Sequence, residues 1–379
     1  MCIDLLYRIA LVMVPGVGGI TAKRLTARFG SPEAVFGAER GQLEKMLHAD
    51  VAANFREGKI LDAARKELAF VEANGIRALF YTDADYPHRL KQCEDSPATI
   101  FVKGNANLNA AKTIAVVGTR KASNYGVALC KKLMTELADK GYKPLVVSGL
   151  AYGIDVSAHL AAMECGFETV AVMGTPANKI YPAAHENIAR RMERQGALVT
   201  EYTSGAPIIP GNFVSRNRII AGLADVVVIV ESSRKGGAMI TAELAAERNR
   251  KIAAFPGRVG DEYSRGCNEL IKSRKASMLE SVEDLEAMMN WSAKPRCVQT
   301  IMNFGQFSER ERAIVECLRN SDSEHVNFIA ARTNTSISEL SSVLLNLVMN
   351  GLLVELPGNR YAVKKIQDRA GNNGATVLL

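Results

Sequence analysis

The chain has 379 residues, of which 47% are apolar and 23% are charged. These proportions are typical of a globular protein, and they exclude a disordered chain and a collagen-like repeat. Because globular domains have roughly 100 to 200 residues, the length predicts two or three domains. The net charge of +7 favours a polyanionic partner without requiring one.

The cysteines and the N-terminal residues indicate a cytoplasmic protein. The seven cysteines lie singly, with no CxxC pair, which argues against a disulfide framework and a zinc knuckle. Asp4 and Arg8 lie where a secretory signal peptide would be apolar, and no apolar run reaches the length of a membrane span. We therefore expect a soluble, cytoplasmic protein that does not enter a membrane.

Most of the positive charge lies in the middle of the chain. Residues 112–290 hold 23 basic and 19 acidic residues, an excess of +4, whereas residues 1–111 hold 14 and 13, an excess of +1. Residues 291–303 add two basic residues and no acidic one, and residues 304–365 hold seven of each. A polyanionic ligand is therefore expected at the middle segment.

Residues 1–75 are predicted to form a helical domain. Residues 4–29 have the apolar spacing of helices on both sides of the sequence Val-Pro-Gly-Val-Gly-Gly at 14–19, which is too rich in glycine to be helical. This pattern predicts a helix-hairpin-helix, SAM-like unit. The amides of such a hairpin can approach a phosphate, but the same unit also packs against or binds protein. The low charge of this region favours packing or protein contact.

Residues 76–290 are predicted to form an extended Rossmann-like domain of the α/β class. From residue 112 onward, continuous apolar runs alternate with amphipathic stretches. Runs of Val, Ile and Ala are typical of strands buried on both faces, and the alternation indicates βαβ units, hence a parallel sheet with helices on both faces. The predicted strands are Thr113–Val117, Pro144–Val147, Thr169–Met173, Ala197–Tyr202, Asp225–Val230 and Lys251–Phe255.

The C-terminal part of the chain is predicted to be a winged helix on a linker. Residues 291–303, which include the only tryptophan, Trp291, are the expected linker, and residues 366–379 are an expected flexible tail. Between them, residues 304–365 contain three short helical patterns and two strand patterns around a Pro-Gly-Asn turn. A winged helix usually binds duplex DNA through its third helix, but that helix, residues 336–350, contains no Lys or Arg. Because DNA affinity depends on neutralising phosphates, we expect this domain to dock on protein.

The loops that follow the predicted strands are rich in glycine and basic residues. In an open parallel sheet, ligands bind beyond the carboxyl ends of the strands, so these loops are expected to lie together. Glycine lets the backbone approach a phosphate, while Arg and Lys supply the countercharge. A row of such sites suits a chain of nucleotides, and Tyr125, Tyr181 and Phe213 are candidates to stack on unpaired bases. The plainer alternative is that the glycines only form tight turns and the basic residues only solvate the rim.

Three arginines in these loops narrow the kind of ligand. A dinucleotide site needs glycine where Arg120 lies, because a side chain there blocks the pyrophosphate. We assign Arg216 to the ligand, since a guanidinium near a helix N-terminus is unfavourable unless an anion is bound. Arg218 is either a second ligand contact or a loop anchor paired with Glu201 or Glu231. The predicted DNA-binding residues are Gly118, Thr119, Arg120, Ser123, Tyr125, Ser148, Gly149, Gly153, Lys179, Arg216, Asn217, Arg218, Lys235, Gly236 and Gly237.

Catalytic motifs are scarce in this sequence. It contains no Walker GxxxxGK[ST], no HExxH and no GxSxG. Asp155 and His159 share one predicted helical turn and could form an acid-base pair or bind a metal. An Asp at a helix N-terminus with a local His partner is the simpler interpretation. We therefore predict a protein that has no catalytic activity and needs no cofactor or metal.

The ordered strand-end motifs resemble those of the DNA-processing protein A family (DprA), also called Smf. The resemblance covers nearly the whole chain, because segments before and after these motifs are similar as well. The third loop departs from the family's usual Gly-x-Gly, since it reads Gly174-Thr175-Pro176 and the proline lacks an amide donor. The matching segments are Asp85–Pro87, Phe101–Asn105, Gly118–Gly126, Ser148–Asp155, Ser215–Leu223, Thr241–Ala245 and Gly266–Ile271.

The resemblance implies a recombination mediator. Such a protein is a dimer, here expected to form through the Rossmann-like domain, that binds single-stranded DNA and helps to load RecA during natural transformation. It also displaces or tolerates the single-strand binding protein. The resemblance implies no catalytic activity. It assigns the phosphate pocket to Gly118, Arg120 and Ser123. Two further family motifs map onto Ser148, Gly149 and Gly153 and onto Arg216 and Arg218.

A rival interpretation is an enzyme similar to the lysine-decarboxylase-like phosphoribohydrolases. These enzymes share a Rossmann core, bind a nucleotide at the same edge of the sheet, and carry the sequence PGGxGTxxE with a glutamate for the chemistry. Residues 231–243 keep a glycine pair and a Glu but lack the Pro and the Gly-Thr. Release of free base from a nucleotide would favour this enzyme over a DNA-binding protein.

Overall fold

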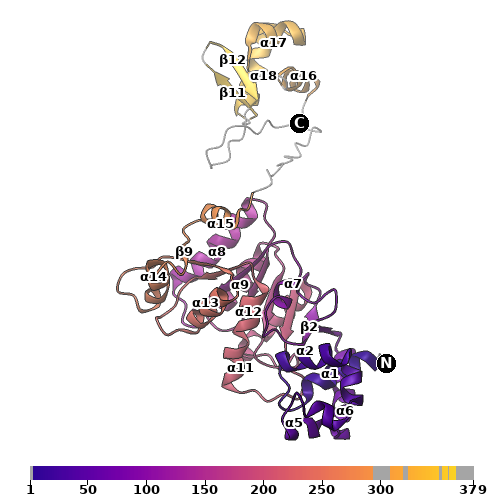
Figure 1. The fold of residues 1–379 in the computed structure, drawn as a ribbon. Coiled ribbons are helices and arrows are strands. Elements are labelled where there is room, and N and C mark those ends of the chain that lie inside the picture. The colour runs from indigo at the N-terminus through magenta and orange to yellow at the C-terminus, as the bar shows by residue number, and fades with distance from the viewer. Residues whose placement is uncertain (1–2, 293–307, 319–322, 350–351, 357, 364–379) are drawn as a thin grey trace. The chain divides into compact units, whose positions relative to one another are not determined.

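The computed structural model describes residues 3–292, 308–318, 323–349, 352–356 and 358–363 of the chain (Figure 1). The chain divides into two compact units, Met1–Pro295 and Arg296–Leu379, which are described separately. The expected boundary between residues 75 and 76 falls inside the first unit and stays a prediction, and the expected tail lies outside the described residues. Within the described ranges, no helix is long and apolar enough to cross a membrane.

A nine-stranded sheet forms the centre of the first unit. Its strand order is β1-β2-β6-β5-β4-β3-β7-β8-β9, and the strands from β6 to β9 run parallel. The six predicted strands are all present, which confirms the Rossmann-like parallel sheet. They are β3 (Thr113–Val117), β4 (Leu145–Ser148), β5 (Thr169–Val172), β6 (Gly196–Thr200), β7 (Val226–Ile229) and β8 (Lys251–Ala254).

Three further strands extend this sheet beyond the predicted runs. β1 (Ile76–Phe80) and β2 (Thr99–Gly104) form an antiparallel pair. β2 also pairs antiparallel with β6, with Phe101 opposite Thr200. At the opposite edge, the short strand β9 (Ser277–Met278) pairs parallel with β8. The sheet is therefore parallel through its centre and antiparallel at one edge.

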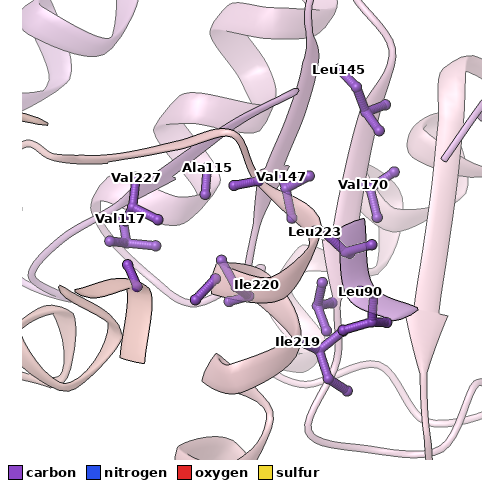
Figure 2. Close-up of a cluster of buried hydrophobic side chains, with 14 of the residues drawn as sticks. Leu90, Ala115, Val117, Leu145, Val147, Val170, Ile219, Ile220, Leu223 and Val227 are labelled. Carbon is purple, nitrogen blue, oxygen red and sulfur yellow. The ribbon is translucent and has the colours of Figure 1, made fainter. Parts of the chain in front are cut away.

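Helices cover both faces of the sheet. Successive residues of a strand point to opposite faces, so each central strand contributes side chains to the core on both sides. Ala115 and Val117 of β3 belong to the buried cluster shown in part in Figure 2, which also contains Ile219 and Ile220 of α12 (Asn217–Leu223). Each valine or isoleucine buried in this way contributes about 1.5–3 kcal/mol. This face is also covered by α7 (His88–Lys91), α13 (Gly237–Glu247) and α14 (Arg265–Lys272), and the opposite face by α8 (Asn124–Asp139), α9 (Ile154–Glu164) and α15 (Val282–Met289).

The N-terminal helices share a core with the antiparallel edge of the sheet. α1 (Ile3–Met13) and α2 (Gly19–Phe29) flank the glycine-rich turn, as the sequence predicted. Their buried residues form one cluster with Phe101 and Leu198 of the sheet, and Figure 1 shows them at one end of the unit. The other helices of the unit are α3 (Pro32–Gly37), α4 (Arg40–Leu43), α5 (Ala49–Asn54), α6 (Gly58–Ala73), η1 (Ala183–His185), α10 (Glu186–Gln195), α11 (Pro210–Ser215) and η2 (Glu262–Ser264).

The second unit is a winged helix, as predicted. The buried side chains Leu340, Leu344 and Leu347 lie on one face of its third helix, because their spacing follows the helical repeat. The three strands form an antiparallel sheet in the order β10-β12-β11. The elements are α16 (Glu309–Leu318), β10 (Glu324–His325), α17 (Val326–Thr333), α18 (Ile337–Met349), β11 (Leu353–Leu356) and β12 (Arg360–Val363).

Candidate functional site

A cavity of about 570 Å³ lies at the carboxyl ends of strands β3, β4 and β7. This is the edge of a parallel sheet where a ligand is expected. The loops after these strands and the segment 208–217 form its walls. The predicted site residues that line it are Gly118, Thr119, Arg120, Arg216, Asn217, Gly236 and Gly237.

Two guanidinium groups bring positive charge to this cavity. Arg120 is exposed, whereas Arg216 is only 4% exposed. Nη1 of Arg216 donates to the backbone oxygens of Gly149, at 2.6 Å, and of Val172. Burial lowers the pKa of Arg216, the Asp155 carboxylate opposes this, and the charge of Arg120 lowers the pKa further. The two arginines are therefore close enough to repel each other, and an anion bound between them would relieve that repulsion.

Asp155 is the acidic residue in the lining, opposite two arginines, so the lining carries a net positive charge. Burial raises the pKa of Asp155, while Arg216 lowers it. The expected pairing of Asp155 with His159 is wrong, because Nδ1 of His159 lies 2.6 Å from Oγ1 of Thr169 and its Nε2 has no hydrogen-bond partner in the described structure. Asp155 instead turns back toward the loop after β4, where its Oδ2 accepts from the amide of Ala151 at 3.4 Å.

Residues of the loop after β4 fix the backbone next to the cavity. A Cβ atom on Gly149 would lie 2.2 Å from Nη1 of Arg216, so only glycine leaves room for the buried guanidinium. Ser148 is buried and donates to the backbone oxygen of Val116 at 2.6 Å. Gly153 has a φ of +77° and precedes helix α9. These three predicted residues position the backbone and are absent from the cavity lining.

The loop after β3 is held by one buried carboxylate. Glu231 accepts hydrogen bonds from the hydroxyl of Ser123 at 2.5 Å and from its amide at 2.9 Å. The amide of Thr119 donates to the backbone oxygen of Glu231 at 2.7 Å. Ser123 also caps α8, since its Oγ accepts from the amide of Gly126 at 3.2 Å. Ser123 therefore fixes the loop that carries Arg120, and its hydroxyl is engaged by protein.

The N-terminus of α13 points backbone donors at the cavity. Its N-cap residue, Gly236, has no side chain to cap the helix, and Gly237 and Ala238 of the first turn line the cavity. The first amides of a helix have no acceptor within the helix, and the helix dipole adds a partial positive charge there. Amides and arginines together make this edge suitable for a phosphate.

Aromatic and aliphatic side chains form another part of the lining. The rings of Tyr181 and Phe213 lie 5.1 Å apart between centroids, and both residues line the cavity. Ile208, Ile209 and Val214 are 42%, 50% and 49% exposed beside them. The two aromatic residues were predicted from the sequence, whereas the aliphatic ones were not. The apolar pair between Pro207 and Pro210 was the signal that could have drawn attention to them.

The other predicted site residues lie outside the lining. Arg218 forms an ion pair with Glu201 and donates to the backbone oxygen of Asp95 at 2.8 Å, so the structure shows the loop-anchor alternative for this residue. The hydroxyl of Tyr125 donates to the backbone oxygen of Pro256 at 3.1 Å. Lys179 and Lys235 are exposed. Among the described residues, no group of three or more His, Cys, Asp or Glu side chains is arranged to hold a metal ion.

Comparisons with known sequences agree along most of the chain. The family model described as DNA recombination-mediator protein A matches residues 77–290, and a DprA winged helix domain model matches residues 307–359. Protein Smf of Escherichia coli (strain K12) is 30% identical over 338 residues, which are 85% of this chain and 89% of that protein. DNA processing protein DprA of Streptococcus pneumoniae is 37% identical over 205 residues, 54% of this chain and 71% of that protein.

Solved structures give the same result. The X-ray structure of DNA processing protein A from Streptococcus pneumoniae superposes with a TM-score of 0.61 at 28% identity, and it covers 76% of this chain and 99% of that one. The structure of DNA processing protein A from Helicobacter pylori, studied for its single-stranded DNA binding mode, superposes with a TM-score of 0.51 at 26% identity. The match covers 57% of this chain and 95% of that one. Because the first family model spans more than half of the sequence, the chain belongs to the DNA recombination-mediator protein A family.

Proposed function

We propose that this protein binds single-stranded DNA in the cavity at the carboxyl ends of β3, β4 and β7. The observation that carries the proposal is the convergence of Arg120 and Arg216 with the uncapped N-terminus of α13 in one cavity. Guanidinium groups and helix N-termini are the two usual means of binding a phosphate. The family relationship, and the relative from Helicobacter pylori with its single-stranded DNA binding mode, support this ligand.

The apolar part of the lining favours a single strand over a duplex. Tyr181 and Phe213 offer ring faces, and Ile208, Ile209 and Val214 offer exposed aliphatic surface next to the phosphate donors. Bases of a single strand can stack on such side chains, whereas bases in a duplex are already stacked on one another. A strand whose phosphates meet the arginines would place its bases against this surface.

The proposed DNA-binding residues play two kinds of role. Arg120, Asn217 and the first turn of α13 would contact the strand directly. Arg216 would add positive charge from its buried position in the cavity lining. A second group would hold the loops in place without touching DNA, as their contacts with protein suggest: Ser123, Ser148, Gly149, Gly153 and Arg218. Tyr125, Lys179 and Lys235 are exposed next to the cavity loops and would extend the path of the strand.

A mobility-shift titration tests this site. Oligo-dT is titrated with the wild type, with Arg120→Ala and with Arg191→Ala, a control that removes an exposed arginine from α10 outside the cavity lining. Loss of one charge-assisted contact should weaken binding about tenfold to a hundredfold, and it should reduce the salt slope by about 0.7. Equal affinity of the two variants across the salt titration would refute the assignment of the cavity, and a stronger preference for a matched duplex would refute the single-strand proposal.

Beyond DNA binding, we propose the role of a recombination mediator that helps to load RecA in natural transformation and recombination. The dimer expected through the Rossmann-like domain, tolerance of the single-strand binding protein and a protein-docking winged helix belong to the same proposal. Appearance of RecA filaments on DNA coated with single-strand binding protein, with and without this chain, tests the loading step. Sedimentation of the purified chain tests the dimer.

The proposal includes no catalysis. The positions of two carboxylates of this chain argue against the phosphoribohydrolase alternative. The carboxylate of Glu231 is bonded to Ser123, and Glu243 is exposed and does not line the cavity. Incubation with AMP decides between the two, because free adenine would appear only if the chain were the enzyme.

A further inference from the structure

The turn between α7 and β2, residues 93–96, receives cationic side chains from three separate elements. The turn is closed by the amide of Ser96, which donates to the backbone oxygen of Cys93 at 3.1 Å. Ser96 and Cys93 are buried, whereas Asp95 is partly exposed. We refer to residues 93–96 as the 93–96 turn.

The first cation comes from the N-terminal helices. Lys23 of α2 donates through Nζ to the backbone oxygen of Glu94 at 2.5 Å and to Oγ of Ser96 at 3.0 Å. Burial lowers the pKa of Lys23, and the Asp95 carboxylate acts in the opposite direction. Lys23 therefore ties α2 to the turn through several hydrogen bonds at once.

The second cation comes from α12, the helix that begins directly after the cavity arginine Arg216. Arg218 of α12 donates to the backbone oxygen of Asp95 at 2.8 Å, and its guanidinium is also paired with Glu201. Asn217, which precedes it directly, lines the cavity, as does Ile220 one turn further along α12. A displacement of the 93–96 turn would therefore be passed to one wall of the cavity.

The third cation comes from the helix that supplies the backbone donors. Arg248, at the C-terminal end of α13, is 9% exposed and pairs with the Asp95 carboxylate at 2.5 Å. The opposite end of α13 carries Gly237 and Ala238, which line the cavity. Both helices that frame the cavity are thus fastened to the same turn.

Close packing makes this connection stiff. A Cβ atom on Gly222 of α12 would lie 2.6 Å from Cδ1 of Leu90, so the backbone of α12 lies directly against α7, the helix that leads into the turn. Figure 2 shows Leu90 beside Ile219 and Leu223 in the buried cluster. Closely packed groups transmit a shift because they cannot be compressed.

From these contacts we infer that Lys23 is a positioning residue for the cavity, through which the N-terminal helices hold α12 and α13 in their binding geometry. The inference rests on the proposed function only in naming DNA as the ligand. Lys23 is not part of the cavity lining, so it acts through the 93–96 turn and not through a phosphate. Without its ammonium group, the oxygen of Glu94 and the hydroxyl of Ser96 lose their shared donor and the turn relaxes.

The test compares Lys23→Met with Lys66→Met, which removes an exposed lysine from α6 and so matches the change in charge. The full-length Lys23→Met variant should bind oligo-dT about twofold to thirtyfold more weakly than the control, the range found when a residue acts through others. Its salt slope should equal that of the wild type, unlike that of Arg120→Ala, because no phosphate contact is lost. Unchanged affinity, or a salt slope reduced as in Arg120→Ala, would overturn the inference.

Hydrogen exchange tests the same inference without DNA. In Lys23→Met, amides of α12 and of the first turn of α13 should exchange faster, while those of α8 on the opposite face should not change. Faster exchange throughout the first unit would show a general structural role and contradict the inference. Asp95→Asn, which retains the backbone oxygens of the turn, should give the same local pattern in a weaker form. If the wild type itself failed to bind oligo-dT, the proposed function would fall while the exchange pattern still decided the role of Lys23.

Discussion

Arg216 and Arg120 line the same cavity but differ in burial and in the partners of their guanidinium groups. Arg216 is buried, donates to two backbone oxygens and faces Asp155, so the fold itself depends on its charge. Arg120 is exposed, and its guanidinium is available to a ligand. Residue type alone predicted that both belong to the site. Which of them is buried depends on the packing of the loop after β4 against α12, which no local pattern encodes.

Replacement of Arg216 should therefore reduce stability, whereas replacement of Arg120 should not. Arg216→Met leaves two backbone oxygens without their donor and Asp155 without its counterion, which should cost about 3–5 kcal/mol. An exposed substitution such as Arg120→Ala should stay within about 0.5 kcal/mol. Denaturant unfolding followed by the fluorescence of Trp291 measures both. Equal stability of the two variants would show that Arg216 is not a structural cation.

His159 should make the first unit sensitive to acid. Burial, with further contributions from Arg216 and His185, lowers its pKa from 6.5 to about 3. Between pH 6.5 and about pH 3, His159 is therefore protonated in the unfolded chain but neutral in the folded chain. The free energy of unfolding has its full value above pH 6.5 and decreases as the pH falls from 6.5 toward 3. The loss should be about 1.4 kcal/mol per pH unit. His159→Asn should give a flatter profile in unfolding experiments at pH 7, 6 and 5, and parallel profiles would contradict this origin.

At the scale of elements, α15 is fastened to the end of α8 by a group of charged and aromatic side chains. Lys140 contacts the carboxylates of Glu283 and Glu286 at 2.8 Å each, and the hydroxyl of Tyr142 donates to Glu286 at 2.7 Å. The ring centroids of Trp291 and Tyr142 lie 5.8 Å apart. The fluorescence of the single tryptophan therefore reports on the packing of α15.

This contact should weaken in acid, with a course that depends on Lys140. Hydrogen bonding to Lys140 lowers the pKa of Glu283 from 4.5 to about 2. A carboxylate with a lowered pKa stabilises the folded state above pH 4.5, and this contribution disappears as the pH falls toward 2. In Lys140→Met, the change in Trp291 fluorescence should move up toward pH 4.5. Identical titration curves for the two proteins would show that the ion pair does not hold α15.

Comparison of individual elements shows what the sequence could predict. Six apolar runs gave the central strands because a strand buried on both faces is apolar at every position. β1 and β2 were not predicted, because they pair antiparallel with each other and β2 joins the sheet only through β6, nearly a hundred residues away in the chain. In the site, glycine and arginine were recognisable by type. The aliphatic wall at Ile208, Ile209 and Val214 was not, because only the tertiary fold brings it to the arginines.

At the scale of the whole molecule, the distribution of charge separates the two units. Residues 112–290 carry an excess of +4, while residues 304–365 carry seven basic and seven acidic residues. On α18, the third helix of the winged helix, the acidic residue Glu339 is not accompanied by any Lys or Arg. Because counterion release dominates DNA affinity, the first unit should account for nearly all of it.

A chain that ends at residue 292 should therefore bind oligo-dT with an affinity within about twofold of the full chain and with the same salt slope, because it retains every residue of the cavity. The described hydrophobic clusters of the first unit contain residues up to Trp291, so the truncation keeps all of their members. Titrations at two salt concentrations, with Trp291 fluorescence as a check on folding, measure the effect. A loss of tenfold or more, with a smaller salt slope, would mean that the winged helix neutralises phosphates despite its balanced charge. An unchanged slope with weaker binding would instead indicate that the second unit acts by protein contact, for example by stabilising a dimer on the strand.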